Sequence, residues 1–155
     1  MTKPAASPAL ALHVRRSFAA SRERVFRAWT EPAELKQWFG ADEGFIIPIA
    51  ELDLRVGGRY RLGMQPPGSD QVLIVGGVYQ EVQAPAKLVF TWRWEAAAAA
   101  EPDTIVTIEF HERGNATEVI LTHELFVDTA QRGSHAHGWE GCFDRLSRLL
   151  SAHPE

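Results

Sequence analysis

The sequence has one cysteine, no long apolar run and no cluster of basic residues. Because Cys142 stands alone, an intrachain disulfide and a thiolate metal cluster are excluded. No stretch approaches the roughly 20 apolar residues that a membrane-spanning helix needs. The N-terminal run MTKPAASPALAL also lacks the continuous apolar region of a secretory signal. These absences predict a cytoplasmic protein without a membrane span.

The charge balance argues against nucleic acid as a partner. Sixteen Lys and Arg side chains stand against twenty Asp and Glu side chains, which gives a net charge of −4. Binding to a phosphate backbone needs Lys and Arg gathered on one surface. The sequence shows no such grouping, so we expect no nucleic-acid partner.

The composition indicates one globular domain. The chain has 155 residues, of which 45% are hydrophobic and 23% charged, and a chain of this length buries a sizeable core. Residues 1–9 are small, polar and proline-containing, so we predict a disordered tail there. Residues 10–152 are predicted to form the single domain.

Alternating apolar residues at 10–18 predict a first strand, and two short helices are expected after it. Ser21 is placed to cap the first helix. Thr30 is expected to cap the second, since Pro32 is tolerated in a first helical turn. Gly40 is expected to end that helix.

From Phe45 to Leu125 the hydrophobic pattern has the period of two that is typical of strands. Six strands separated by turn residues are predicted in this region, all antiparallel. Gly76 and Gly77 fall inside one of them, which indicates a bulge or a sharp bend. The alanine run at 96–100 is too short for an isolated helix and is interpreted as a hairpin loop.

The C-terminal part predicts a long amphipathic helix that begins after Asp128, with Gln131 completing a capping box. Its apolar stripe is formed by Trp139, Cys142, Phe143, Leu146, Leu149 and Leu150. Such a stripe needs an apolar partner, and the concave face of the sheet is the surface expected to supply it. Gly133, Gly138 and Gly141 lie in the first half of the helix. They indicate either a close approach or open volume beneath it, or else an irregular first turn.

Several stretches of the chain resemble one family. They are SRERVFRAWTEPAELKQWFG, DLRVGGRYRL, GVYQEVQAPAKLVFTW, TIVTIEF, NATEVILTHELF and GWEGCFDRLSRLL. In this order they resemble the START-like (SRPBCC) superfamily, in the branch homologous to the C-terminal domain of the activator of Hsp90 ATPase (AHSA1-like). The resemblance implies an α+β helix-grip fold. In that fold a curved antiparallel seven-stranded sheet wraps around a long C-terminal helix, with two short helices after the first strand.

The resemblance also implies a cavity between the sheet and the C-terminal helix, and with it the binding of a hydrophobic or aromatic small molecule. A cyclase-like or aromatase-like enzyme is one alternative, with the pocket His and Tyr residues His123, His135 or Tyr60 as proton carriers. An Hsp90-type co-chaperone partner is another. The sequence has no nucleophile elbow, phosphate loop or dinucleotide fingerprint, so we expect binding rather than catalysis and no cofactor. A homodimer through an exposed strand edge or through the tryptophan-rich face stays open.

Twelve residues are candidates for the lining of this cavity. They are Trp38, Phe39, Phe45, Tyr60, Leu62, Met64, Phe90, Trp92, His123, His135, Trp139 and Phe143. Strand alternation points His123 inward, either as a ligand-binding group or proton carrier or as a hydrogen-bonded core residue. His135 is interpreted as facing the pocket or the surface. The spacing of His135 and His137 does not suit chelation from one helix face, so no metal is expected.

Overall fold

Seven antiparallel strands form one strongly curved sheet in the computed structural model of the protein, which describes residues 10–155. The tail predicted at residues 1–9 lies outside the described residues. The strands are β1 (Leu12–Phe18), β2 (Ile46–Leu52), β3 (Arg59–Gln65), β4 (Leu73–Gln83), β5 (Lys87–Trp94), β6 (Thr104–Arg113) and β7 (Ala116–Glu124). The helices are α1 (Arg22–Thr30), α2 (Pro32–Trp38) and α3 (Thr129–Ala152).

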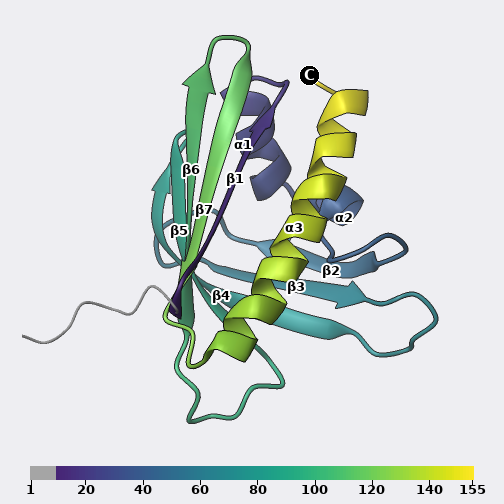
Figure 1. Cartoon of the computed structure of the whole chain (residues 1–155), viewed down its shortest axis with the longest axis vertical. Helices are drawn as coiled ribbons and strands as arrows, with labels where there is room; N and C mark the ends of the chain where they lie inside the picture. Colours follow the sequence, from purple (N-terminus) through teal and green to yellow (C-terminus); the bar gives the residue numbers. More distant parts are fainter. Residues whose placement is uncertain (1–9) are drawn as a thin grey trace, which may run out of the picture.

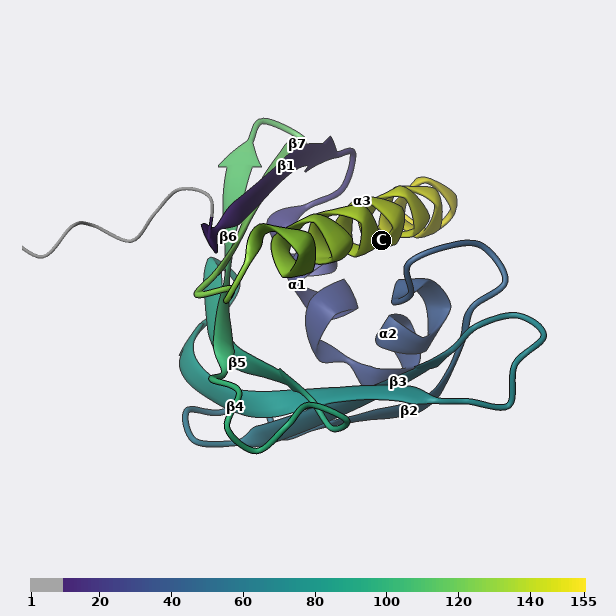
Figure 2. The same ribbon diagram turned by 60° about the horizontal axis from the view of Figure 1, so that its bottom comes forward.

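The sheet order is β1-β7-β6-β5-β4-β3-β2, and α3 lies along its concave side (Figure 1). Figure 2 shows the sheet curling around the helices, with α1 and α2 between α3 and the half of the sheet that contains β2 and β3. The helices contact opposite edges of the sheet, α3 against β1 and α2 against β2. This arrangement confirms the predicted helix-grip fold.

The boundary between α1 and α2 differs from the prediction by one residue. Ser21 caps α1 as expected, but Thr30 is the last residue of α1 and donates its hydroxyl to the Phe26 carbonyl at 2.9 Å. Glu31 occupies the N-cap of α2 without a side-chain capping bond to the described chain. Pro32 follows it in the first turn of α2, where a missing N–H is tolerated. The connection between α1 and α2 is therefore the single residue Glu31, directly before Pro32.

The two adjacent glycines of β4 allow close packing of the strands, and the bulge lies elsewhere. The register between β4 and β5 shifts between Tyr79 and Glu81, so the bulge falls after the glycines. An added Cβ on Gly77 would collide with the carbonyl oxygen of Thr91, and one on Gly76 would lie 2.9 Å from that of Tyr60. Glycine is required there because backbone atoms of the neighbouring strands occupy the space that a side chain would need.

The helix α3 begins and docks as its sequence predicts. Asp128 accepts a hydrogen bond from the Gln131 backbone at 2.8 Å, and the Gln131 side chain accepts one from the Val127 backbone at 3.1 Å. The buried residues of α3 are Trp139, Cys142, Phe143, Leu146 and Leu150. Within residues 10–155, no helix is both long enough and apolar enough to cross a membrane.

The three glycines of α3 have different surroundings, and the helix is regular through all of them. At Gly141 an added Cβ would overlap the carbonyl oxygen of Ala41, so this residue permits a close approach to the loop after α2. At Gly133 and Gly138 an added Cβ would meet no atom of residues 10–155 within 4 Å. Only Gly141 is required for packing.

This contrast gives a matched pair of variants. We expect Gly133→Ala to raise the free energy of unfolding by about 0.5–1 kcal/mol, because alanine is the better helix former and its methyl group has space. Gly141→Ala is expected to lower it by about 1–3 kcal/mol, because the helix must move away from Ala41. Urea unfolding of both variants measures the difference. Equal stability of the two would contradict the close contact.

Candidate ligand-binding site

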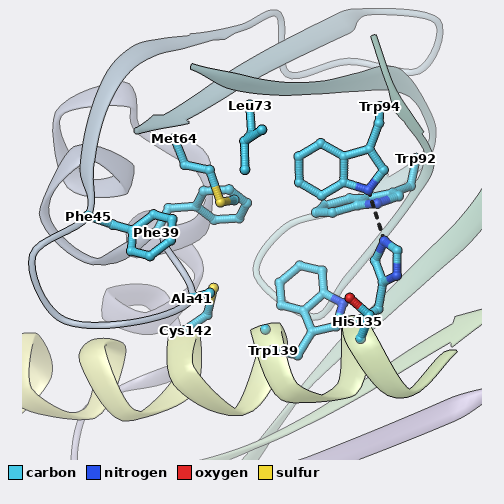
Figure 3. Close-up of a pocket in the computed structure, with 12 residues that line it drawn as sticks. Phe39, Ala41, Phe45, Met64, Leu73, Trp92, Trp94, His135, Trp139 and Cys142 are labelled. Atoms are coloured by element: carbon cyan, nitrogen blue, oxygen red, sulfur yellow. Dashed lines mark hydrogen bonds between the residues drawn. The ribbon is translucent and has the colours of Figure 1, made fainter. Parts of the chain in front are cut away.

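An apolar cavity of about 240 Å³ lies between the first half of α3 and strands β3, β4 and β5 (Figure 3). The loop between α2 and β2 forms its third side. Among residues 10–155, none of the side chains that line it is charged. The cavity therefore lies between the sheet and the C-terminal helix.

The structure brings six of the twelve candidate residues together around this cavity. They are Phe39, Phe45, Met64, Trp92, His135 and Trp139. Three of their aromatic rings contact one another, with centroid distances of 5.1 Å between Trp92 and Trp139, 6.2 Å between Phe39 and Trp139, and 6.4 Å between Phe39 and Trp92. These rings form an aromatic wall.

Three other candidates, Tyr60, Leu62 and Phe90, lie deeper against the sheet. They line a separate void of about 20 Å³, on the far side of the Phe39, Trp92 and Trp139 wall. Such a void has room for about one water molecule. The prediction that Tyr60 bounds the ligand cavity is corrected, because the aromatic wall stands between them.

The remaining candidates, Trp38, His123 and Phe143, belong to the core. The Trp38 indole donates to the Ala28 carbonyl at 2.9 Å and ties α2 to α1. Phe143 lies one turn beyond Trp139 and packs on Phe18, with ring centroids 5.9 Å apart. His123 is fully buried and does not line the cavity. Their inward direction was predicted, but their depth was not.

The loop that forms the third side of the cavity is held by the side chains of α3. The Arg145 guanidinium donates to the carbonyls of Phe39 at 3.3 Å and Phe45 at 3.4 Å. The Gly40 backbone donates to the Cys142 sulfur at 3.4 Å. Burial raises the pKa of Cys142 to about 12, so its thiol stays protonated and is unsuited to act as a nucleophile.

His135 lies at the cavity with both ring nitrogens engaged. The Trp94 indole donates to His135 Nε2 at 2.9 Å, the bond drawn as a dashed line in Figure 3. Its Nδ1 lies 2.8 Å from the carbonyl oxygen of Gln131. Because a carbonyl only accepts and an indole only donates, the ring is neutral with its proton on Nδ1. Burial lowers its pKa and favours this neutral form.

His123 makes a second bond of the same kind behind the cavity. The Trp139 indole donates to His123 Nδ1 at 3.0 Å, and His123 Nε2 lies 2.7 Å from the Thr104 hydroxyl. That hydroxyl donates to the Trp92 carbonyl at 3.2 Å, so it accepts from His123 Nε2. Burial, with a smaller effect from nearby His135, lowers the pKa of His123 to about 2. At neutral pH this imidazole is therefore uncharged.

Tyr60, the third candidate proton carrier, is also committed to a structural bond. Its hydroxyl donates to the Thr91 carbonyl at 2.5 Å. Burial raises its pKa well above the ordinary value for tyrosine, and Tyr79 adds to that effect. Among residues 10–155, no group of three His, Cys, Asp or Glu side chains is placed to hold a metal ion.

Comparison with known families matches residues 19–151 to the family described as "Activator of Hsp90 ATPase homolog 1-like protein" (AHSA1). The chain belongs to this family. A comparison with curated proteins finds no match. The AHSA1 family lies in the START-like superfamily, so the resemblance found in the sequence is confirmed.

Solved structures show the same fold as this AHSA1-family chain. A protein from Chromobacterium violaceum is 28% identical, with a TM-score of 0.81, and the match covers 90% of this chain and 96% of that one. The AHSA1 protein from Silicibacter pomeroyi is 28% identical, with a TM-score of 0.78 and coverage of 92% and 98%. A protein from Nitrosomonas europaea is 26% identical, with a TM-score of 0.78 and coverage of 94% and 97%.

Six cavity residues of the AHSA1-family chain are not among the twelve candidates. They are Ala41, Leu73, Trp94, Ser134, Gly138 and Cys142. The last three recur every four residues on α3, so helical spacing from His135 and Trp139 would have found this stripe. Trp94 shares a strand face with Trp92, which was also readable. Ala41 lies in an irregular loop, and no pattern in the sequence marks it.

The burial of neutral His123 predicts a pH-dependent stability. Its pKa lies near 2 in the folded state and near 6.5 in an unfolded chain, so the unfolded state binds the proton first as pH falls. The free energy of unfolding therefore keeps its full contribution from neutral His123 above about pH 6.5, and this contribution is lost progressively as the pH falls below that value. Between about pH 7.5 and about pH 5 we expect wild type to lose about 2 kcal/mol more than His123→Gln. Parallel curves of unfolding free energy against pH for the two proteins would contradict the assignment.

Proposed function

We propose that this protein binds a hydrophobic small molecule in the cavity between α3 and the sheet. The observation that carries the proposal is a 240 Å³ cavity with aromatic walls that the side chains of the protein leave open. Ligand sites of proteins are typically concave and mostly apolar, with few polar groups. Each Å² of apolar ligand surface removed from water contributes about 25 cal/mol.

Gly138 supports the proposal because it lies on the cavity side of α3. It lines the cavity, and a Cβ placed on it would meet no atom of residues 10–155 within 4 Å. A glycine inside a helix costs about 0.5–1 kcal/mol relative to alanine. At this position glycine gains no packing contact that would offset this cost. The missing side chain keeps volume open beside Trp139.

The two alternative functions have less support. A cyclase-like enzyme would need a group that exchanges protons with a substrate, and His123, His135 and Tyr60 each use their polar atoms in bonds within the protein. The co-chaperone alternative rests on the family description and has no residue assigned to it. A cytoplasmic location and a homodimer stay predictions.

Filling the cavity from α3 tests the proposal. In Gly138→Leu the new side chain projects into the cavity, so we expect the affinity for naphthalene, used as an apolar probe, to fall at least about tenfold. Gly133→Leu is the matched control, since Gly133 is also a helical glycine with open space but does not line the cavity. Its affinity is expected to stay within about twofold of wild type.

Titration calorimetry measures the three affinities, and circular dichroism with thermal unfolding establishes that each variant is folded. Binding of naphthalene that is equal in folded Gly138→Leu and in wild type would refute this site. Absence of binding to wild type would refute the function for ligands of this size.

A further inference from the structure

The cavity offers no oppositely charged partner for an ionised group. Among residues 10–155, its lining contains no Asp, Glu, Lys or Arg side chain, and its histidine is neutral. The guanidinium of Arg145, next to the loop between α2 and β2, donates to the carbonyls of Phe39 and Phe45. A charge moved from water into an apolar site without a partner is strongly disfavoured. The lining therefore selects against carboxylates, phosphates and ammonium groups.

Nearly all polar side-chain atoms of the lining are already in use. Trp94 and His135 bond to each other, Trp139 bonds to His123, and the Cys142 sulfur accepts from Gly40. The Trp92 indole nitrogen has no partner among residues 10–155, but it is buried and offers the cavity no accessible donor.

Ser134 is the exception in this lining. It is exposed and also lines the cavity, so it lies at the mouth. Its hydroxyl has no hydrogen-bond partner within residues 10–155 and can both donate and accept. A bound molecule thus finds one uncommitted polar side chain, and finds it at the entrance.

The volume limits the size of the ligand. An apolar cavity of about 150 Å³ is known to hold benzene, and sites for drug-sized molecules begin at about 300 Å³. A cavity of 240 Å³ lies between these values. Its volume suits a molecule of one or two fused rings.

We propose that the ligand is an uncharged aromatic molecule of one or two rings, with a hydroxyl, carbonyl or ether oxygen that hydrogen bonds with Ser134 at the mouth. This inference rests on the proposed function and adds the class of ligand. The ring system lies against Phe39, Trp92 and Trp139, and the oxygen substituent lies at the mouth against the Ser134 hydroxyl.

A set of probes with one ring system tests the role of charge. Naphthalene, naphthol, naphthoate and naphthylmethylammonium have the same fused rings and differ in one substituent. At pH 7.5 we expect naphthol to bind at least about tenfold more tightly than either ion, because each ion gives up more hydration in the apolar lining than the single Ser134 hydroxyl replaces. Aromatic rings also attract cations, so tighter binding of the ammonium probe than of naphthalene would overturn the proposal, as would equal binding of naphthoate and naphthol.

Ser134→Ala tests the polar contact at the mouth. Its affinity for naphthol is expected to fall about two- to tenfold, and its affinity for naphthalene is expected to stay within about twofold of wild type. Equal losses for both probes, or no loss for naphthol, would refute the role of Ser134.

The Gly138→Leu variant distinguishes failure of the proposed function from failure of the proposed ligand class. If it blocks naphthalene while wild type binds all four probes alike, the site stands and the ligand class is wrong. If wild type binds none of the probes, the proposed function and the ligand class both fail.

Discussion

Two hydrogen bonds between tryptophan and histidine set the position of α3 over the sheet. One runs from Trp94 on β5 to His135 on α3, and the other runs from Trp139 on α3 to His123 on β7. Each contributes about 0.5–1.5 kcal/mol net, but leaving a buried partner unpaired costs more. Because each imidazole is bonded through both nitrogens, neither ring can turn without losing two bonds. The first half of the helix is therefore held in one register above the strands.

The cavity follows from holding α3 at two sides while leaving the space between them unfilled. On one side are the tryptophan and histidine pairs, and on the other Gly141 lies against the backbone of Ala41. Protein interiors normally close such gaps because dispersion contacts favour dense packing. Here closure would require α3 to move, which would break buried bonds on one side and create a collision on the other. The open volume beside Gly138 is thus a consequence of how the helix is anchored.

The sequence predicts features that depend on neighbouring residues, such as helix caps and strand alternation. It does not predict how deeply a side chain lies within the fold. Asp128 and Ser21 were identified as caps because a cap depends on residues three positions away, and the seven strands followed from alternation. Thr30 was assigned one position too early because the sequence alone does not say where the chain leaves α1. Strand alternation correctly predicts that the side chains of Tyr60 and His123 point to the concave face of the sheet. Both nevertheless lie behind the aromatic wall. Their distance from the cavity depends on the curvature of the sheet, which alternation does not encode.

The bonds that hold the cavity open also remove its acid–base chemistry. A histidine that carries protons needs one nitrogen free to reach a substrate, and in His123 and His135 every nitrogen is bonded to the protein. Freeing Nε2 of His135 would release the Trp94 indole and with it one attachment of α3. Proton transfer and an anchored helix therefore compete for the same atoms. In this structure the anchor occupies them, so under the proposed function shape, neutrality and the hydroxyl at the mouth select what enters.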